Sequence, residues 1–291
     1  MNKLTFSVII PTYNRAELLG SALRSLVAQT YKNFEVIVCD DGSVDHTKEV
    51  VESFKNDLNI KYIWEENWGG PARPRNNGIK AASSEWICFL DDDDWWYSNK
   101  LSYINNYLDK ADIIHHDLDR FDAKGKKVRK LKGRQLERPV FIDLITRGNA
   151  LWTSSVVVKR ELLEKVNLFD EDRNLIALED FDTWLKISRV TEKFLYINKS
   201  LGAYWISGTN ITQPTEEYYN RINYLYQKYF PLLSRTERFR AEAFMSYLLG
   251  RIKQKLRFKK QAIELFKISI HSNDLKIKLK SFLMLVLLKL Y

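Results

Sequence analysis

Residues 86–96 read WICFLDDDDWW, an apolar run followed by four consecutive aspartates and two tryptophans. Trp86 to Leu90 shows no polar alternation and is rich in aromatic side chains, which predicts a strand buried on both faces. Four carboxylates therefore follow the end of a buried strand. Two unit charges about 4 Å apart repel by roughly 1 kcal/mol in water and by more near a protein surface, so the cluster favours a bound divalent cation. An acidic turn that caps a helix is the alternative.

The residues before this stretch alternate between strand and helix patterns. Strands are expected at 6–10, 34–39, 60–64 and 86–90, and helices at 16–29, 45–54 and 74–82. This alternation predicts an α/β fold with right-handed crossovers and a mostly parallel sheet flanked by helices. Ligands of such sheets bind outside the carboxyl ends of the strands. The polar segments that follow those ends should converge on one crevice: 11–15, 40–43, 65–67 and 91–94.

The composition indicates a large folded core in a reducing compartment. The chain has 291 residues, of which 45% are hydrophobic, so it is long enough for one large domain with or without an appendage. Cys39 and Cys88 lie inside apolar runs and are expected to be buried free thiols, which fits the cytoplasm. The first fifteen residues contain only a short apolar run that ends at Pro11, so neither a signal peptide nor a membrane span is expected there.

The net charge of +9 is concentrated near the end of the chain. Residues 251–291 contain eleven Lys or Arg against two acidic side chains, so the other 250 residues are neutral overall. This distribution argues against a nucleic-acid-binding protein, because only the tail has the excess positive charge needed to bind a polyanion. The stretch 276–291, KIKLKSFLMLVLLKLY, has only seven consecutive apolar residues, whereas a membrane span needs about 20. It is expected to be a helix that lies on an anionic membrane surface, or one that packs on its own domain or on a second subunit of a homodimer.

Five segments, in this order, resemble the family 2 inverting glycosyltransferases of the GT-A fold: SVIIPTYNR, VIVCDDGSVDHT, ARPRNNGI, WICFLDDDDWW and LEDFDTWL. The resemblance covers residues 6–187. It implies a Rossmann-like GT-A domain over 1–215, in which 1–100 bind the nucleotide sugar and 101–215 the acceptor. The basic helical region 216–291 lies outside it.

The resemblance also implies an activity. It is the inverting transfer of a hexose or N-acetylhexosamine from a nucleotide sugar, expected to be a UDP-sugar, to a hydroxyl of a glycan or lipid-linked acceptor. The setting implied is bacterial surface polysaccharide assembly, of the capsule or O-antigen type, in the cytoplasm or on the inner face of the cytoplasmic membrane.

Roles for the donor-binding loops follow from the resemblance, position by position. The first loop, Pro11, Thr12, Tyr13 and Asn14, is expected to pack on the nucleotide, and Asp40 to accept a hydrogen bond from the uracil ring, with Asp41 beside it. An arginine before the helix at 74–82 approaches the donor. Pro74 lies between Arg73 and Arg75, so which of the two does so stays open.

The four aspartates correspond to the family's D-x-D element. In an extended segment alternate side chains share a face, so Asp91 with Asp93, or Asp92 with Asp94, could form the pair. The resemblance places Asp91 on the ribose side as a second metal ligand, Asp92 in the variable donor-side slot and Asp93 on the metal, Mn²⁺ or Mg²⁺. Asp94 supports them, and Asp92 is expected to be the most replaceable.

The last segment supplies the catalytic base. Inversion needs a base that takes the proton of the acceptor hydroxyl as it attacks. The resemblance assigns that role to Asp180, with Glu179 as the fallback. Trp184, one helical turn further on, is either a wall beside the sugar or a core residue.

Other functions explain less of the sequence. A dinucleotide oxidoreductase would need G-x-G-x-x-G after the first strand, where this chain has PTYNRAELLG. A metal-dependent phosphatase or a phosphoacceptor receiver domain would leave the pair at 179–180 unexplained. A catalytically silent module that binds nucleotide sugars or glycans stays open, because a fold does not establish activity. Such a module would bind nucleotide without turnover.

Overall fold

The structure is a computed structural model that describes residues 4–206, 213–272 and 274–290. The described residues form two compact units. The first unit contains residues 4–136, 150–171 and 179–206, and the second contains 137–149, 172–178 and the chain from 213 onward. Two short segments from the middle of the sequence thus belong with the helical tail.

The first unit has the α/β fold predicted from the alternating pattern. All four expected strands and all three expected helices of the first hundred residues are present. Its elements are β1 (Phe6–Thr12), α1 (Ala16–Val27), β2 (Phe34–Asp40), α2 (Thr47–Ser53), β3 (Ile60–Trp64), α3 (Ala72–Ala81), β4 (Trp86–Phe89), β5 (Trp95–Trp96), α4 (Lys100–Asn105), β6 (Ile113–Phe121), β7 (Lys127–Leu131), η1 (Thr153–Ser155), β8 (Val157–Lys159), α6 (Arg160–Lys165), α7 (Glu179–Ile187) and β9 (Phe194–Trp205).

The strands form one mixed sheet in the order β3-β2-β1-β4-β8-β6-β9-β5, with β7 beside β6. The four N-terminal strands are parallel, so their carboxyl ends lie at the same edge. The three-residue strand β8 runs antiparallel between β4 and β6, whereas β6 and β9 are parallel. The parallel part expected from the sequence is therefore extended by strands whose pairing the pattern did not reveal.

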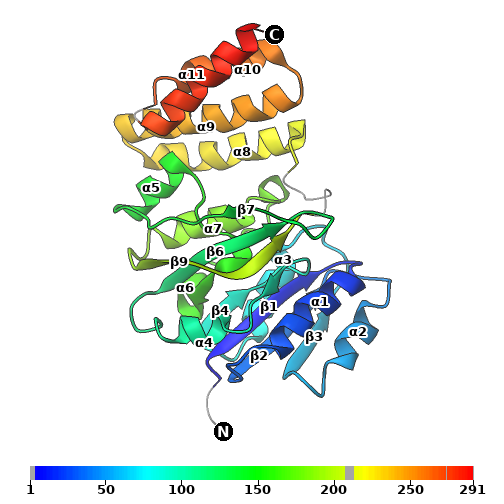
Figure 1. Ribbon diagram of the computed structural model, residues 1–291. Coiled ribbons are helices and arrows are strands. Elements are labelled where there is room, and N and C mark those ends of the chain that lie inside the picture. Colours follow the sequence, from blue (N-terminus) through cyan, green and yellow to red (C-terminus); the bar gives the residue numbers. More distant parts are fainter. Residues whose placement is uncertain (1–3, 207–212, 273, 291) are drawn as a thin grey trace. The chain divides into compact units, whose positions relative to one another are not determined.

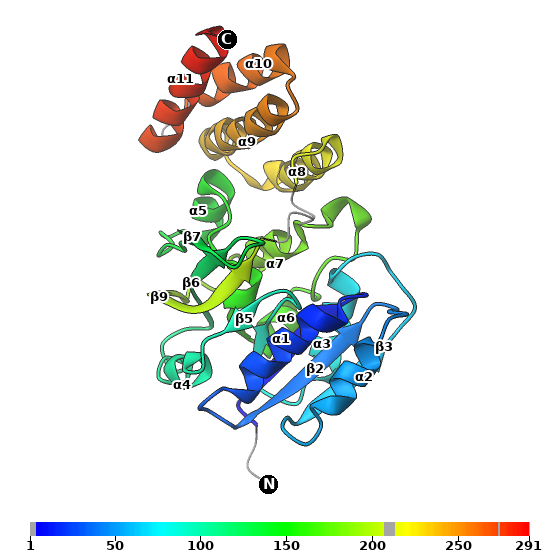
Figure 2. The ribbon, with the colours of Figure 1, turned by 45° about the vertical axis from the view of Figure 1, so that its right-hand side comes forward.

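Helices cover both faces of the parallel strands (Figures 1 and 2). Phe6, Val8 and Ile10 of β1 pack in one buried cluster with residues of α1 and α2. Ile9 points to the other face, where a Cβ added to Gly78 of α3 would lie only 2.6 Å from it. Glycine therefore allows α3 to pack closely against the sheet. Cys39 and Cys88 are free and buried, as expected.

The second unit is helical in its described residues. It contains α5 (Val140–Arg147), η2 (Arg173–Leu175), α8 (Glu216–Tyr229), η3 (Phe230–Leu232), α9 (Arg235–Lys255), α10 (Lys259–Ser269) and α11 (Leu275–Leu290). Figure 1 shows α9 between α8 on one side and α10 and α11 on the other. Ser234 and Glu237 form a capping box at the start of α9. In the described parts of the chain, no helix has the length and apolar character needed to cross a membrane.

Candidate active site

The four aspartates form a turn and not the extended segment expected from the sequence. The backbone N–H of Asp94 donates to the carbonyl of Asp91 at 3.1 Å, which closes the turn over Asp92 and Asp93. The side chains consequently do not alternate between two faces. Each carboxylate has its own set of neighbours.

Asp92 and Asp93 face the loop after β1. Thr12 Oγ1 donates to Asp92 at 2.8 Å, and one nitrogen of Arg15 lies 3.0 Å from Asp92 and 3.2 Å from Asp93. Asp92 is 5% exposed, so the position expected to be the most replaceable is instead a buried anchor for the first loop. Arg15 has no role in the sequence analysis, although it stands in the PTYNR segment that carried the resemblance.

The acidic turn holds more negative charge than its neighbours neutralise. Burial, together with Asp92 and Asp91, raises the pKa of Asp93 to about 7. Burial, and then Asp93, raises the pKa of Asp94 well above its usual range, and burial raises that of Asp92 to about 6. A cation bound beside these groups would reverse this trend because it favours the ionised carboxylates.

Arg75 joins the acidic turn to the start of α7. Its guanidinium donates to Asp91 and to Glu179, each at 2.7 Å, and its side chain is only 5% exposed. Arg73 points elsewhere, because it stacks on Trp68 and pairs with Glu171 at 3.0 Å. Both arginines lie within the first turn of α3, where Pro74 is tolerated. The structure thus brings Arg75, and not Arg73, into the acidic cluster.

Asp180 lies next to Glu179 in the first turn of α7. Its carboxylate accepts from Thr153 Oγ1 at 2.9 Å and from the backbone N–H of Phe181 at 2.6 Å. Burial, and next the charge of Glu179, raises the pKa of Asp180 to about 7, although Arg75 and Thr153 both act to lower it. A carboxylate with a pKa near neutrality can accept a proton under ordinary conditions.

A short 3-10 helix, η1, is hydrogen-bonded to both acidic motifs. Thr153 bonds to Asp180, and the next residue, Ser154, accepts the backbone N–H of Asp91 at its Oγ, at 3.0 Å. The carbonyl of Ser154 also accepts from Trp96 Nε1 and Lys100 Nζ, each at 2.9 Å. Neither Thr153 nor Ser154 was found from the sequence, because nothing in their local pattern signals these long-range contacts.

The two loops expected to contact the nucleotide are bonded to each other. Asn14 has a φ of 50°, its side-chain carbonyl accepts from the N–H of Val44 at 2.8 Å, and its own N–H donates to Ser43 Oγ at 2.7 Å. Asp40 accepts from the N–H of Ser43 and from the hydroxyl of Tyr62. These bonds fix the two loops to each other at the carboxyl ends of β1 and β2.

Asp41 and Tyr13 differ in whether their side chains are available to a ligand. The carboxylate of Asp41 accepts from the N–H groups of Trp68 and Gly69, at 2.8 and 3.0 Å, and so anchors the loop after β3. Tyr13 is 47% exposed and can contact a ligand.

Trp184 occupies the core. It is 0% exposed and packs near Phe89 and Phe169, with ring centroids 6.1 Å apart in both cases. This is the core position weighed against a sugar wall in the sequence analysis, and a ligand cannot reach it without rearrangement.

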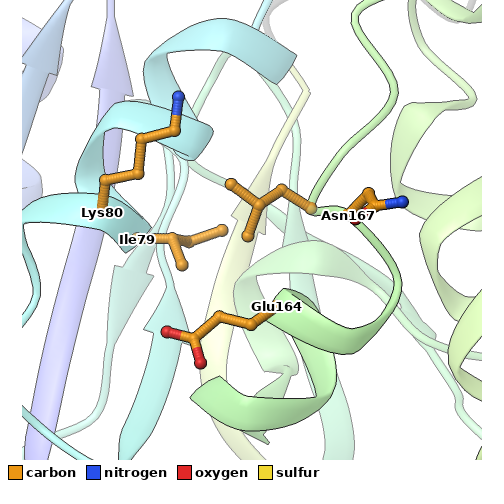
Figure 3. Close-up of a pocket in the computed structure, with 5 residues that line it drawn as sticks. Ile79, Lys80, Glu164 and Asn167 are labelled. Carbon is orange, nitrogen blue, oxygen red and sulfur yellow. The ribbon is translucent and has the colours of Figure 1, made fainter.

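A hollow of about 350 Å³ lies elsewhere on the first unit (Figure 3). It is lined by Ile79 and Lys80 near the end of α3 and by Glu164, Asn167 and Leu168 at the end of α6 and beyond. It contains none of the acidic residues described above.

In the described residues, no three His, Cys, Asp or Glu side chains form a ready metal site. The donor set of the turn nevertheless suits a hard divalent ion, since it offers carboxylate oxygens only. Ions such as Mg²⁺ commonly take one or two protein carboxylates and complete their shell with phosphate and water. Asp91 and Asp93 fit that requirement.

Comparison with known proteins shows the family. The sequence profile described as "Glycosyl transferase family 2" matches residues 7–165. The chain belongs to this family. Its relatives include AmsB, an amylovoran biosynthesis glycosyltransferase of Erwinia amylovora, 33% identical over 70% of each chain. A Campylobacter jejuni enzyme named GalNAc(5)-diNAcBac-PP-undecaprenol beta-1,3-glucosyltransferase is 34% identical over 69% of this chain and 64% of that one.

Several relatives are much longer than this chain. An uncharacterized glycosyltransferase of Rickettsia conorii is 35% identical over 75% of this chain, but the match covers only 36% of that protein.

Two solved structures share the fold. S. aureus TarS, residues 1–349 in complex with UDP-GlcNAc, has a TM-score of 0.67 at 23% identity and covers 94% of this chain and 83% of that one. The mannosyltransferase PcManGT from Pyrobaculum calidifontis, in complex with GDP-Man and Mn²⁺, has a TM-score of 0.62 at 18% identity, over 100% and 82%. The first unit is thus a family 2 domain of the GT-A fold.

Proposed function

We propose that this family 2 protein transfers one sugar, with inversion, from a UDP-sugar to a hydroxyl of a glycan or lipid-linked acceptor. One observation carries the proposal: Arg75 bonds to both Asp91 and Glu179 and so joins the acidic turn to the helix that begins beside Asp180. A donor-side acid cluster and a base of suitable pKa then lie within one unit. The named activities of AmsB and the Campylobacter enzyme support this reaction class.

Asp180 acts as the general base in this proposal. Its carboxylate takes the proton of the acceptor hydroxyl while the hydroxyl oxygen forms a bond to the anomeric carbon. The bond from that carbon to the diphosphate breaks at the same time, and the nucleoside diphosphate leaves with the electron pair. Attack from the face opposite the leaving group inverts the anomeric centre. Thr153 holds one oxygen of Asp180, so the carboxylate is oriented before substrate arrives.

The donor is proposed to lie against the loops after β1 and β2. Residues 11–14 and Asp40 would hold the nucleotide, with Asp41 fixing the neighbouring loop after β3, and the UDP-GlcNAc complex of TarS supports a uridine nucleotide. PcManGT is bound to GDP-Man, so the base itself is a subject of the test below. Arg75 would approach the donor from the buried side of the cluster. By this scheme residues 1–100 serve the donor and 101–215 the acceptor.

A divalent ion, Mn²⁺ or Mg²⁺, is proposed to bind at Asp93 and Asp91. The all-oxygen donor set and the raised pKa of Asp93 support it, as does the Mn²⁺ complex of PcManGT. When bound, such an ion neutralises charge on the departing diphosphate.

The test is a panel of nucleotide sugars, screened for thermal stabilisation and for hydrolysis with and without Mg²⁺ or Mn²⁺. Asp93→Ala should abolish metal-dependent donor binding. Asp180→Asn should bind donor with unchanged affinity and lose transfer, whereas Asp109→Asn, at an exposed acid of the same unit, should match wild type. Wild-type turnover by Asp180→Asn would refute the base assignment. Donor binding without any turnover by the wild type would favour a silent binding module.

We also propose that α11 rests on an anionic membrane surface, where a lipid-linked acceptor would be found. Leu275, Leu279, Phe282 and Val286 recur at helical spacing and are 67%, 59%, 56% and 37% exposed. Such a continuous apolar stripe on a surface indicates a contact site.

The opposite face of α11 is occupied. Ile277 is 7% exposed and Ser281 is fully buried, and the hydroxyl of Ser281 pairs with that of Ser269 in α10 at 2.7 Å. One side of the helix therefore packs within its own unit and the other faces outward.

Exposed lysines flank the apolar stripe on both sides. Lys276 and Lys280 share one flank, and Lys278 lies on the other. This arrangement suits an amphipathic helix whose lysines reach anionic head groups while the stripe enters the interface. Each lysine near such a surface contributes about 1 kcal/mol. The charges favour a membrane over a second copy of the chain, because two lysine-flanked stripes would repel each other.

Flotation with phosphatidylcholine vesicles containing about one third phosphatidylglycerol tests this surface. Binding should fall at high salt, on vesicles of phosphatidylcholine alone, and in the variant Leu279→Ser/Phe282→Ser. Phe239→Ser, an exposed phenylalanine of α9, is the matched control. Equal binding by the α11 variant would refute the proposal, and loss of a homodimer in that variant would show that a second subunit covers the stripe.

A further inference from the structure

A cluster of three aromatic side chains follows directly on the acidic turn. It consists of Trp95 in β5, Phe121 at the end of β6 and Trp205 at the end of β9, and is called the aromatic platform below. The ring of Trp95 lies 5.1 Å from that of Phe121, tilted by 44°, and 6.2 Å from that of Trp205, tilted by 54°. Trp95 therefore forms the centre of a continuous aromatic surface.

Strand pairing places the platform on one face of the sheet. Trp95 pairs with Ala203, and Phe121 pairs with Trp205. Ala203 and Trp205 are two residues apart in β9, so their side chains share a face. The three rings thus come from three neighbouring strands and are positioned by backbone hydrogen bonding.

The platform is only partly buried. All three of its residues keep intermediate exposure, whereas the next tryptophan in the chain, Trp96, is 2% exposed and Trp184 is 0% exposed. Burial of apolar surface stabilises a fold, so large rings left in water forgo part of that stabilisation. Three adjacent large rings left in this state indicate a surface that a ligand covers.

The platform is attached to the proposed metal side of the site. Trp95 is linked to Asp94 through the peptide bond, and the N–H of Trp205 donates to Asp94 Oδ1 at 3.0 Å. Its strands β6, β9 and β5 also lie at the end of the sheet order opposite to β3 and β2, whose loops carry the proposed nucleotide contacts. A ligand on the platform would approach the acidic turn from the side away from the nucleotide.

We propose that the aromatic platform binds a pyranose ring of the acceptor glycan. A pyranose presents a face of C–H groups that stacks on the electron-rich face of an aromatic ring, while its hydroxyls stay in water at the edge. We assign the platform to the acceptor sugar and not to the donor sugar because it lies across the acidic turn from the nucleotide loops. This inference rests on the proposed function, because only a glycosyl acceptor gives a pyranose reason to bind there.

The experiment measures binding of free pyranosides by saturation-transfer NMR, with UDP and Mg²⁺ at saturating concentration. The probes are the methyl glycosides of glucose, galactose, mannose and N-acetylglucosamine. At least one should give a signal with wild type that falls at least five-fold in Trp95→Leu/Trp205→Leu and is retained in Trp205→Phe. The matched control is Tyr103→Leu/Tyr107→Leu, which removes a second partly exposed aromatic pair of the same unit, with centroids 5.5 Å apart.

Two further measurements distinguish failure of this inference from failure of the proposed function. UDP affinity by calorimetry should agree within two-fold in all variants, and so should the KM for donor hydrolysis. Equal pyranoside binding by wild type and the double leucine variant, or none by wild type, would overturn the inference. A raised donor KM with unchanged pyranoside binding would assign the platform to the donor sugar and overturn it as well. Failure of wild type to bind any nucleotide would instead reject the proposed function.

Discussion

Replacing Arg75 by methionine tests the contact that joins the two acidic motifs. The guanidinium makes two charge-assisted hydrogen bonds of 2.7 Å and is 5% exposed, so its loss leaves Asp91 and Glu179 without their buried cation. Removal of one partner of a buried ion pair costs about 3–5 kcal/mol. Arg73→Met is the matched control. Arg73 is 36% exposed, and the loss of such a pair costs at most about 1 kcal/mol.

Urea unfolding followed by tryptophan fluorescence measures this difference. All eight tryptophans lie in the first unit, so the signal reports the free energy of unfolding of that unit. The deficit of Arg75→Met should be smaller at pH 6 than at pH 8. Arg75 acts to lower the raised pKa of Asp180, so without it that pKa rises further. The folded state then binds more protons than the unfolded state near neutral pH, and stability falls as pH rises. A deficit no larger than that of Arg73→Met, or one that does not depend on pH, would refute the reasoning.

Three more predictions follow from Asp180 and its surroundings. Because Asp180 must be ionised to accept a proton and its pKa is raised to about 7, kcat/KM should fall about ten-fold per pH unit below pH 7; a flat profile down to pH 5 would contradict this assignment. Thr153→Val removes a hydrogen bond that lowers the pKa of Asp180, so the acid limb of the pH–rate profile should move to higher pH, and Thr153→Ser should restore it. Trp184→Ala should lower the free energy of unfolding by about 3–5 kcal/mol because the side chain is fully buried; unchanged stability with lost sugar binding would restore the wall role.

Much of the parallel half of the sheet could be predicted from local pattern. The runs 6–10, 34–39 and 86–90 are apolar without alternation because both faces of β1, β2 and β4 are covered by helices. The converging loops followed from the direction of these strands. The helical tail was equally readable, since its apolar residues recur at helical spacing.

The remainder depends on contacts that no local pattern encodes. The strand β8 has three residues, and only its position between β4 and β6 makes it part of the sheet. The shape of the acidic turn depends on the bond of Asp91 to Ser154, a residue 63 positions later in the chain. The burial of Asp92 likewise comes from Thr12 and Arg15, about 80 positions earlier. Charge and motif predicted a site at these loops, but the individual contacts of its residues could not be predicted from the sequence.

The placement of Thr153 and Ser154 has a consequence for how the site keeps its dimensions. Adjacent residues contact Asp180, the proposed base, and Asp91. The spacing between Asp180 and the acidic turn is therefore set by one dipeptide, whose Cα atoms are about 3.8 Å apart. Lengthening the loop between β6 and β7 should leave that spacing intact, whereas one residue inserted between Thr153 and Ser154 should separate the two motifs. Two covalently linked residues thus fix the distance between parts of a site that lie about 90 positions apart in the sequence.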